Sequence, residues 1–378
     1  MKFPGSWGRV GVMGALALGL SLLSACSGTP KPAPATLEPN VPLLGIRQVW
    51  AQQVGAVNFP LELRVVADRL FAASSTGTVA VIDVRSGTDV WRTDLKAEIA
   101  AGVGSDGRFV AVVTRGNELV VLDEGKVQWR YKLAAATLTS PLVAGARVFT
   151  LSADRTVQAF DVRTGQRLWA QQRSGDALVL GQAGLLTAVG DTLVAGLGGR
   201  VVGMNPLNGS SRWEAPVANP RGTNEVERLG DVVAGFSREG TQLCVRAFQY
   251  AATCLDAQAG TVTWSRTASG STGLSGDASV VLGSEGDGRL LAWRRSDGER
   301  LWQSDRLRFR TLSAPLLMGR SFVVGDENGT LHFLAKEDAA PLNRLETDGS
   351  ALRAAPVLAG QTLLAVSSKG GIFAFRPE

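Results

Sequence analysis

One spacing, Asp-x3-Gly-x3-Trp, recurs along this chain of 378 residues at intervals of about forty residues. Three copies are complete, two replace the aspartate by asparagine or arginine, and one has a turn two residues shorter. In chain order the copies begin at Asp83, Asp123, Asp161, Asn205, Asp256 and Arg294 and end at Trp91, Trp129, Trp169, Trp213, Trp264 and Trp302. A fixed period in the forties is typical of arrays of identical units, and here it predicts the blades of a β-propeller.

The unit over residues 141–169 shows how one blade is expected to fold. Residues 147–151 and 156–160 alternate between apolar and polar as half-buried strands do, and a turn separates them. Asp161 can cap the next turn through its carboxylate, and Gly165 can supply the positive φ that the hairpin needs. With an inner strand before these elements and an outer strand after them, each blade is predicted to be a four-stranded antiparallel meander.

Counting such units predicts an all-β fold of eight blades. Six units end at the tryptophans named above, and a seventh, degenerate unit ends at Leu345. An eighth begins at Pro356 and stops one strand short, after Gly371–Phe375. We expect Ile46–Trp50 to supply the missing strand, so that the N- and C-terminal strands pair and close the ring. Seven blades remain the alternative if the degenerate unit is not a blade.

Residues 1–25 are predicted to be a lipoprotein signal peptide. A basic start precedes an apolar stretch, Val10–Leu23, that is too short to span a bilayer. The Leu-Ser-Ala-Cys run that ends at Cys26 resembles a bacterial lipobox, in which the cysteine carries the lipid and becomes the mature N-terminus. Ser27 follows where inner-membrane retention would favour aspartate, which by lipoprotein rules indicates an anchor on the periplasmic face of the outer membrane.

Residues 26–42 are expected to form an extended, proline-rich tether. Five prolines favour the polyproline-II conformation, which rises about 3.1 Å per residue. Such a tether would hold the propeller, residues 43–378, off the membrane.

Charge and aromatic content exclude several kinds of partner. The formal net charge is +5, but the basic residues are scattered and form no run with interleaved aromatics, so no nucleic acid is expected. Tryptophans at the same position in successive blades are expected to pack between sheets rather than to bind a ligand. We therefore expect no small-molecule substrate, no cofactor and no enzymatic activity.

Residues that often carry chemistry are few. His332 is the single histidine, which excludes a zinc site of several histidines, and we expect a structural role for it. No metal site is expected. Cys244 and Cys254 flank a predicted hairpin turn near Gln249, which would place them opposite each other and allow a structural disulfide. A register slip of one residue would separate them.

The repeats resemble those of pyrroloquinoline-quinone (PQQ) dehydrogenase propellers, most clearly over residues 77–91 and 161–169. Lipobox, proline-rich tether and eight such blades together resemble the BamB family, the lipoprotein propellers of the outer-membrane β-barrel assembly machine. This resemblance covers nearly the whole chain. It implies a non-catalytic periplasmic scaffold that aids the folding and insertion of outer-membrane proteins. Its implied partners are the POTRA domains of BamA and the other subunits of the assembly complex.

The same resemblance implies partner-binding residues in loops between the middle blades. They match a Leu-x-Leu segment and an Arg-Leu-x-Asp-x-Asp stretch of the family, and here they are Leu178, Leu180, Arg228, Leu229 and Asp231. Gly181 stands where the family has arginine after the first motif, and Val233 replaces the second aspartate, which leaves the detailed contacts open. Independently of the family, residues 218–228 form a long loop on a rigid scaffold, where function is often found.

Two other functional classes remain open. A PQQ-type or sugar-binding propeller enzyme would share the repeats. Such a dehydrogenase needs carboxylates around a metal and usually adjacent cysteines, but this chain has no adjacent cysteine pair and is much shorter than that family. An envelope lipoprotein with another protein partner would share both the repeats and the lipobox. Pull-down from solubilised envelopes would best separate these classes.

Overall fold

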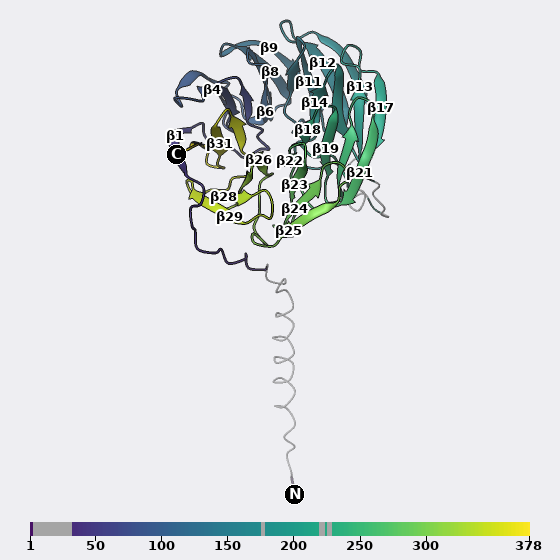
Figure 1. Ribbon diagram of the computed structural model, residues 1–378. Coiled ribbons are helices and arrows are strands. Elements are labelled where there is room, and N and C mark those ends of the chain that lie inside the picture. The colour runs from purple at the N-terminus through teal and green to yellow at the C-terminus, as the bar shows by residue number, and fades with distance from the viewer. Residues whose placement is uncertain (3–31, 175–177, 219–223, 225–228) are drawn as a thin grey trace. The chain divides into compact units, whose positions relative to one another are not determined.

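The structure is a computed structural model that describes residues 1–2, 32–174, 178–218, 224 and 229–378 (Figure 1). The chain divides into two compact units, Met1–Pro34 and Ala35–Glu378, and the second contains every strand. Among the described residues, no helix is long and apolar enough to cross a membrane.

Eight sheets, each of four antiparallel strands, form the blades of a propeller (Figure 1). From inner to outer strand, blades 1 to 4 are β2 (Arg64–Val66), β3 (Arg69–Ala73), β4 (Thr78–Asp83), β5 (Asp89–Asp94); β6 (Ile99–Ser105), β7 (Phe109–Thr114), β8 (Glu118–Asp123), β9 (Lys126–Lys132); β10 (Leu142–Ala144), β11 (Arg147–Leu151), β12 (Thr156–Asp161), β13 (Arg167–Gln172); and β14 (Leu186–Val189), β15 (Thr192–Leu197), β16 (Arg200–Met204), β17 (Ser211–Pro216).

Blades 5 to 8 repeat the arrangement. They are β18 (Ser237–Glu239), β19 (Gln242–Ala247), β20 (Ala251–Asp256), β21 (Thr261–Thr267); β22 (Leu274–Gly276), β23 (Val280–Ser284), β24 (Leu290–Arg294), β25 (Arg300–Ser304); β26 (Leu316–Met318), β27 (Ser321–Gly325), β28 (Thr330–Ala335), β29 (Pro341–Glu346); and β30 (Val357–Ala359), β31 (Thr362–Val366), β32 (Gly371–Pro377) with β1 (Ile46–Gln53).

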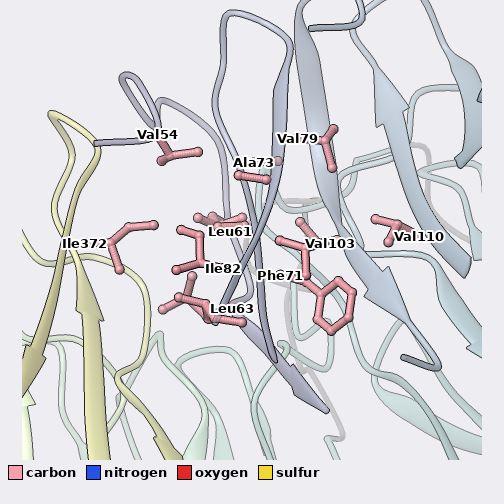
Figure 2. Packing of buried hydrophobic residues seen from close by; sticks show 14 of the residues in the cluster. Val54, Leu61, Leu63, Phe71, Ala73, Val79, Ile82, Val103, Val110 and Ile372 are labelled. Atoms are coloured by element: carbon pink, nitrogen blue, oxygen red, sulfur yellow. The ribbon is translucent and has the colours of Figure 1, made fainter. Parts of the chain in front are cut away.

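Blade 8 closes the ring with strands from both ends of the chain. β1 pairs antiparallel with β32, from Ile46 opposite Pro377 to Gln53 opposite Gly371. The predicted eight blades and the closure by terminal strands are therefore confirmed, and the alternative of seven blades is wrong. Apolar side chains join neighbouring blades. Figure 2 shows Ile372 of blade 8, Ile82 of blade 1 and Val110 of blade 2 in one cluster.

The meander gives the ring two distinct faces. Turns between first and second strands, and between third and fourth strands, lie on one side, which we call the hairpin face. Turns between second and third strands lie on the other side, together with the connections from each outer strand to the next blade. We call this second side the interblade face. Among the described residues, the longer connections between strands lie on this face.

The repeat spacing has a packing cause: the tryptophan of one blade lies on the glycine of the next. Gly165 has a φ of +73°, and a Cβ at this position would lie 2.6 Å from the Trp129 ring. Trp129 also donates its indole N–H to the Val162 carbonyl at 2.8 Å. Glycine is needed here both for the positive φ and for the indole above it.

Blade 7 departs from this pattern. The strand register places Asn343 opposite Phe333, as it places Trp169 opposite Ala159 in blade 3. The residue at the tryptophan position is therefore Asn343, and the prediction that this unit ends at Leu345 is wrong by two residues. The strand register defines the tryptophan position, whereas the sequence prediction chose the nearest large apolar residue.

Residues 35–44, which we call the strap, pack on the outer edge of blade 7. Leu43 and Leu44 donate backbone N–H groups to the Leu342 carbonyl at 2.8 and 3.2 Å, and Leu37 packs against a buried apolar cluster. Residues 35–42, the last part of the segment predicted to be a tether, thus have apolar and hydrogen-bonding partners on the propeller.

Candidate partner-binding surface

The two segments predicted to bind a partner meet on the interblade face. Leu180 donates its backbone N–H to the Asp231 carboxylate at 3.0 Å. Beyond this contact, Gly184 forms an antiparallel bridge with Val233. The first segment follows β13 and the second precedes β18, so these bonds join the entrances to blades 4 and 5. Side chains far apart in sequence thus form one surface.

The burial of these residues sorts them into exposed and anchoring positions. The Leu178 side chain is 37 % exposed, whereas Leu180, Leu229 and Asp231 are half-buried. Val233, at the position where the resemblance expects a second aspartate, is only 3 % exposed. Its apolar side chain belongs to the interior, which explains why a carboxylate is absent there.

A cavity of about 60 Å³ lies beside the junction of the two segments. Apolar side chains supply much of its lining, and one arginine and one aspartate are its charged members. The lining includes Leu138, Ala153, Arg155, Val179, Leu180 and Asp231. An apolar centre with charged groups at its edge is the usual composition of a protein-binding surface.

Arg155 is a component of this surface that sequence reasoning did not find. It lies in the turn between β11 and β12 with a φ of +61°, a conformation that blades 1 and 6 give to Gly77 and Gly288. A long side chain in a left-handed turn is uncommon and is often found at functional sites. An arginine at the glycine position of a repeat was the available signal.

Several predicted positions lie outside the described residues. They are Cys26, Arg228 and the loop residues 219–223 and 225–227. The predicted lipidation site and the predicted basic contact of the second motif therefore remain predictions.

A second cavity, of about 170 Å³, lies where the inner strands of the first five blades converge. Glu62, Arg64 and Ser140 contribute polar groups, and Phe236 and Leu186 contribute apolar surface. Burial raises the pKa of the Glu62 carboxyl, while Ser140 and the charge of Arg64 oppose this shift. This channel is the place where a small polar ligand would fit if the quinone- or sugar-binding alternative held.

The remaining candidate residues are buried. His332 is 1 % exposed and its Nε2 lies 2.9 Å from the Asp326 carboxylate, which also accepts the Thr330 and Asn328 backbone N–H groups. Desolvation acts to raise the pKa of Asp326, but its bonds to His332 and these amides outweigh it and lower the pKa. Across the part of the chain that the structure describes, no three His, Cys, Asp or Glu side chains gather as metal ligands.

Cys244 and Cys254 lie directly opposite each other on β19 and β20. Their sulfur atoms are joined as a disulfide in the structure, and both residues are fully buried. Gln249 lies in the turn between the two strands with a φ of +52°. The pair packs against Trp264 and Trp293, so its surroundings are those of a structural bond.

Solved structures similar to this chain have the same propeller fold. The crystal structure of BamB from Moraxella catarrhalis matches with a TM-score of 0.80 and 24 % identity, covering 88 % of this chain and 99 % of that one. Quinohemoprotein alcohol dehydrogenase from Comamonas testosteroni matches with a TM-score of 0.68 and 14 % identity, covering 90 % and 78 %. At these identities the likeness shows the fold alone.

Sequence relatives identify the family. The outer membrane protein assembly factor BamB of Burkholderia pseudomallei is 35 % identical over 96 % of this chain and 97 % of its own length. The BamB of Bordetella pertussis is 32 % identical over 99 % of this chain and 98 % of its own length. The family model described as outer membrane protein assembly factor BamB matches residues 75–304. The chain therefore belongs to the BamB family of outer membrane protein assembly factors.

Proposed function

We propose that this chain is a non-catalytic scaffold lipoprotein that works in outer-membrane protein assembly by binding the POTRA domains of BamA. Its relatives carry the name of outer membrane protein assembly factors, which supports a role in that process. In this proposal Cys26 carries the lipid, and the propeller lies on the periplasmic face of the outer membrane.

The junction between the Leu178–Leu180 segment and Asp231 is the observation that carries this proposal. The hydrogen bond from the Leu180 N–H to the Asp231 carboxylate holds the segment two residues after Leu178, and both bonded residues line the cavity. Leu178 is 37 % exposed, and an accessible apolar residue near an apolar-lined cavity suits the centre of a partner contact. Arg155 and Asp231 provide charges that can select the orientation of a partner.

A pull-down from solubilised envelopes tests the proposal. The affinity-tagged wild-type chain is expected to capture BamA, and Leu178→Arg is expected to lose most of it, because a charge would replace the apolar centre. Leu207→Arg is the matched control, since Leu207 is 64 % exposed but lies in the hairpin between β16 and β17, on the hairpin face. Both variants should keep the wild-type circular dichroism and Tm.

A second pair of variants separates direct contact from positioning. Arg155→Glu is expected to weaken capture by changing the charge at the cavity edge. Asp231→Ala removes the acceptor of the Leu180 N–H, so capture should fall because the segment is no longer held. If Leu178→Arg and Arg155→Glu both retain BamA while folded, the binding surface lies elsewhere. If the wild-type chain captures no BamA, the proposal fails.

The quinoprotein alternative is tested at the channel that Glu62 and Arg64 line. Purified protein incubated with PQQ and calcium is expected to show neither the absorbance of a bound quinone nor dye reduction with alcohols or glucose. Dye reduction that Glu62→Gln abolishes would favour the enzyme instead.

A further inference from the structure

The connection between blades 6 and 7 presents an aromatic side chain to solvent. Phe309, between β25 and β26, is 38 % exposed. Among the described residues, Leu178 and Phe309 are the exposed large apolar side chains in the interblade connections. Apart from Met1, the others lie in the strap, in strands or in the β16–β17 hairpin. Leu178 belongs to the proposed partner surface, and Phe309 lies three blades away from it.

Phe309 is held outward by a rigid loop, Asp305–Arg310. Arg308 N–H bonds the Asp305 carbonyl at 3.0 Å, and Phe309 N–H bonds the Asp287 carbonyl at 2.6 Å. Leu307 is 2 % exposed and anchors the loop in an apolar cluster. Phe309 itself has a φ of +63°, a strained conformation for an aromatic residue. The fold therefore imposes the exposure of this ring.

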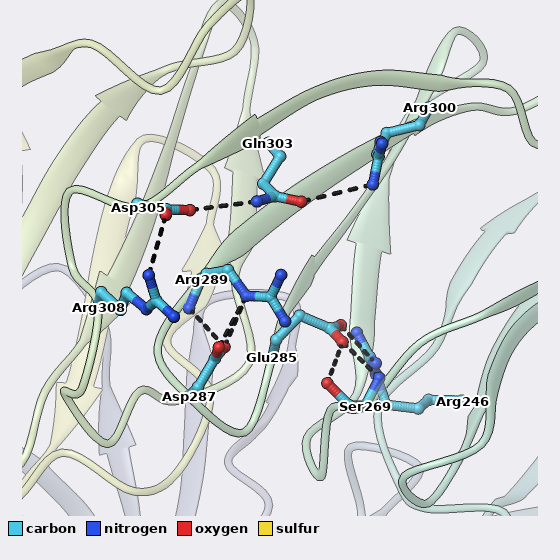
Figure 3. Close-up of polar contacts among 9 residues, drawn as sticks. All are labelled: Arg246, Ser269, Glu285, Asp287, Arg289, Arg300, Gln303, Asp305 and Arg308. Carbon is cyan, nitrogen blue, oxygen red and sulfur yellow. Dashed lines mark hydrogen bonds and ion pairs between the residues drawn. The ribbon is translucent and has the colours of Figure 1, made fainter. Parts of the chain in front are cut away.

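Two half-exposed arginines belong to the same loop: Arg308 lies beside the ring, and Arg306 pairs with Glu38 of the strap. The Arg306 and Arg308 side chains are 45 % and 46 % exposed. Arg308 lies over the Phe309 ring at 4.9 Å, and its bond to Asp305, visible in Figure 3, is long at 3.5 Å. Exposed ion pairs of this kind are weak, so a phosphate group can compete for either guanidinium. An aromatic ring with arginines beside it suits the interface between lipid head groups and acyl chains.

The strap brings the N-terminal end of the chain to this loop. Ala35 N–H bonds the Arg308 carbonyl at 2.9 Å, and Arg310 donates to the Ala35 carbonyl at 3.3 Å. Ala35 follows Cys26 by nine residues in the sequence. Nine residues reach at most about 30 Å even when fully extended. A lipid on Cys26 would therefore keep the Asp305–Arg310 loop close to the membrane surface.

We propose that the Asp305–Arg310 loop contacts a phospholipid surface, with Phe309 entering the head-group region and Arg306 and Arg308 meeting lipid phosphates. The inference rests on the proposed function, because it needs the lipid anchor at Cys26. It adds an orientation: the interblade face at blades 6 and 7 lies against the membrane, and the Leu178 surface shares that face three blades away.

The test places a polarity-sensitive fluorophore on Phe309→Cys in the lipidated full chain, reconstituted into vesicles of phosphatidylethanolamine and phosphatidylglycerol. The native thiols do not interfere, since Cys26 would carry lipid and Cys244 and Cys254 are buried and bonded. We expect the emission to shift to the blue relative to the detergent-solubilised chain. Leu207→Cys, more exposed but on the hairpin face, should show no shift.

Adding Arg308→Glu to the labelled chain should reduce the blue shift, because each arginine near an anionic surface changes partitioning by about fivefold. Arg85→Glu is the control, because Arg85 is an exposed arginine that pairs with Asp68 on the hairpin face. This change should leave the blue shift unchanged. Equal emission at positions 309 and 207, or no shift at either, overturns the proposal. So does a chain that does not stay with the vesicles, since the anchor would then be absent.

The vesicles contain no protein, so this readout does not depend on capture of BamA. A blue shift at position 309 in a chain that captures no partner would support the membrane contact while the proposed partner fails. Capture of BamA without a blue shift would support the proposed partner and contradict the membrane contact.

Discussion

Blades 3 and 7 occupy equivalent positions in the ring but hold their outer edges by different means. In blade 3 the repeat residues are Asp161, Gly165 and Trp169, and the Trp169 indole donates to the Pro206 carbonyl of the next blade at 3.0 Å. The corresponding residues in blade 7 are Ala335, Ala339 and Asn343. No residue of the repeat triplet survives in blade 7, yet the four-stranded sheet is complete.

The asparagine in blade 7 keeps the hydrogen bond of the tryptophan that it replaces. Asn343 donates its side-chain amide to the Leu44 carbonyl of the strap at 2.8 Å. This bond crosses the boundary between blades 7 and 8, which we call the seam. Its carbonyl oxygen accepts from the Asn40 side chain at 3.2 Å. Blade 8 has no hairpin between its outer strands, because the chain ends meet there, so no turn glycine is present to receive an indole.

The comparison teaches that the repeat encodes contacts between successive hairpins rather than the blade itself. Where the next hairpin carries its glycine, an indole on that glycine joins the blades. At the seam, a polar side chain and the strap join them instead. Leu44 of the strap and Ile46 of β1 belong to the same apolar cluster as Leu342 and Leu345, which supplies apolar contacts near the edge that lacks tryptophan.

The largest test of this comparison removes β1. Deleting residues 46–53 should cost several kcal/mol or prevent folding, because seven register pairs and the packing of Trp50 on Gly87 are lost at roughly 25 cal/mol per Å² of apolar surface. Thermal unfolding followed by circular dichroism measures the effect.

Two further deletions show how much of the loss in Tm is specific to β1. Removing residues 35–40 takes away the strap contacts of Leu37 and Asn40 and should lower the Tm by less than removing β1. Removing residues 27–34, which belong to the other compact unit, should leave the Tm unchanged. Equal effects of the last two deletions would mean that the strap contributes nothing to the seam.

The sequence predicts the contacts that recur in every repeat, but it does not predict contacts that occur once between distant segments. The spacing of Asp161, Gly165 and Trp169 predicts the meander and the number of blades, because these contacts recur at a fixed distance along the chain. The closure, which pairs the two ends of the chain, follows from the count because the last unit lacks one strand. The strap contacts join Asn40 to Asn343, about 300 residues apart, through side chains that belong to no repeat. No periodic signal announces such a contact.

The candidate site shows the same division. Leu178, Leu180 and Asp231 came from a resemblance, and the structure places their segments together through the Leu180–Asp231 bond. Arg155 belongs to a different blade and to no family motif. It joins the surface only because the turn after β11 lies beside the cavity.

Substitutions at the tryptophan position should show the difference between the blades directly. Trp169→Ala removes a side chain that is 9 % exposed and should cost about 3–5 kcal/mol. Asn343→Ala removes a buried hydrogen-bonding group and should cost about 1–2 kcal/mol. Urea unfolding of both variants gives the two free energies. If Asn343→Ala costs as much as Trp169→Ala, the asparagine has a larger role at the seam than its bonds explain.

The glycine position offers a reciprocal pair of substitutions. Gly165→Ala places a methyl group against the Trp129 ring at a positive φ and should cost about 1–3 kcal/mol. Ala339→Gly makes the opposite change in blade 7, where the residue already has a φ of +58°. Loss of a buried methyl and relief of the strained φ oppose each other there, so the free energy of unfolding should change by less than about 1 kcal/mol. A large loss in Ala339→Gly would show that blade 7 uses that methyl as a packing contact.

The smallest effect expected is the pH dependence at the aspartate position. The Thr164 N–H, which Asp161 accepts at 2.8 Å, is the main cause that lowers the pKa of this carboxyl, with the Thr164 hydroxyl and the Arg163 N–H adding to it. A lowered pKa stabilises the fold above the unfolded-state pKa of about 3.9, and this stabilisation is lost as the pH falls through the folded pKa.

Asp161→Asn keeps the shape and the acceptor but removes the charge. It should therefore cost at most about 1 kcal/mol at pH 7, because the site is partly exposed, and the difference from wild type should shrink as the pH falls below the unfolded-state pKa and through the folded one. Ala335→Asn, at the same position in blade 7, should show no such pH-dependent difference, because no carboxylate is removed there. Tm measurements across this pH range decide the matter. A difference for Asp161→Asn that persists at low pH would mean that the side chain acts through packing rather than through its charge.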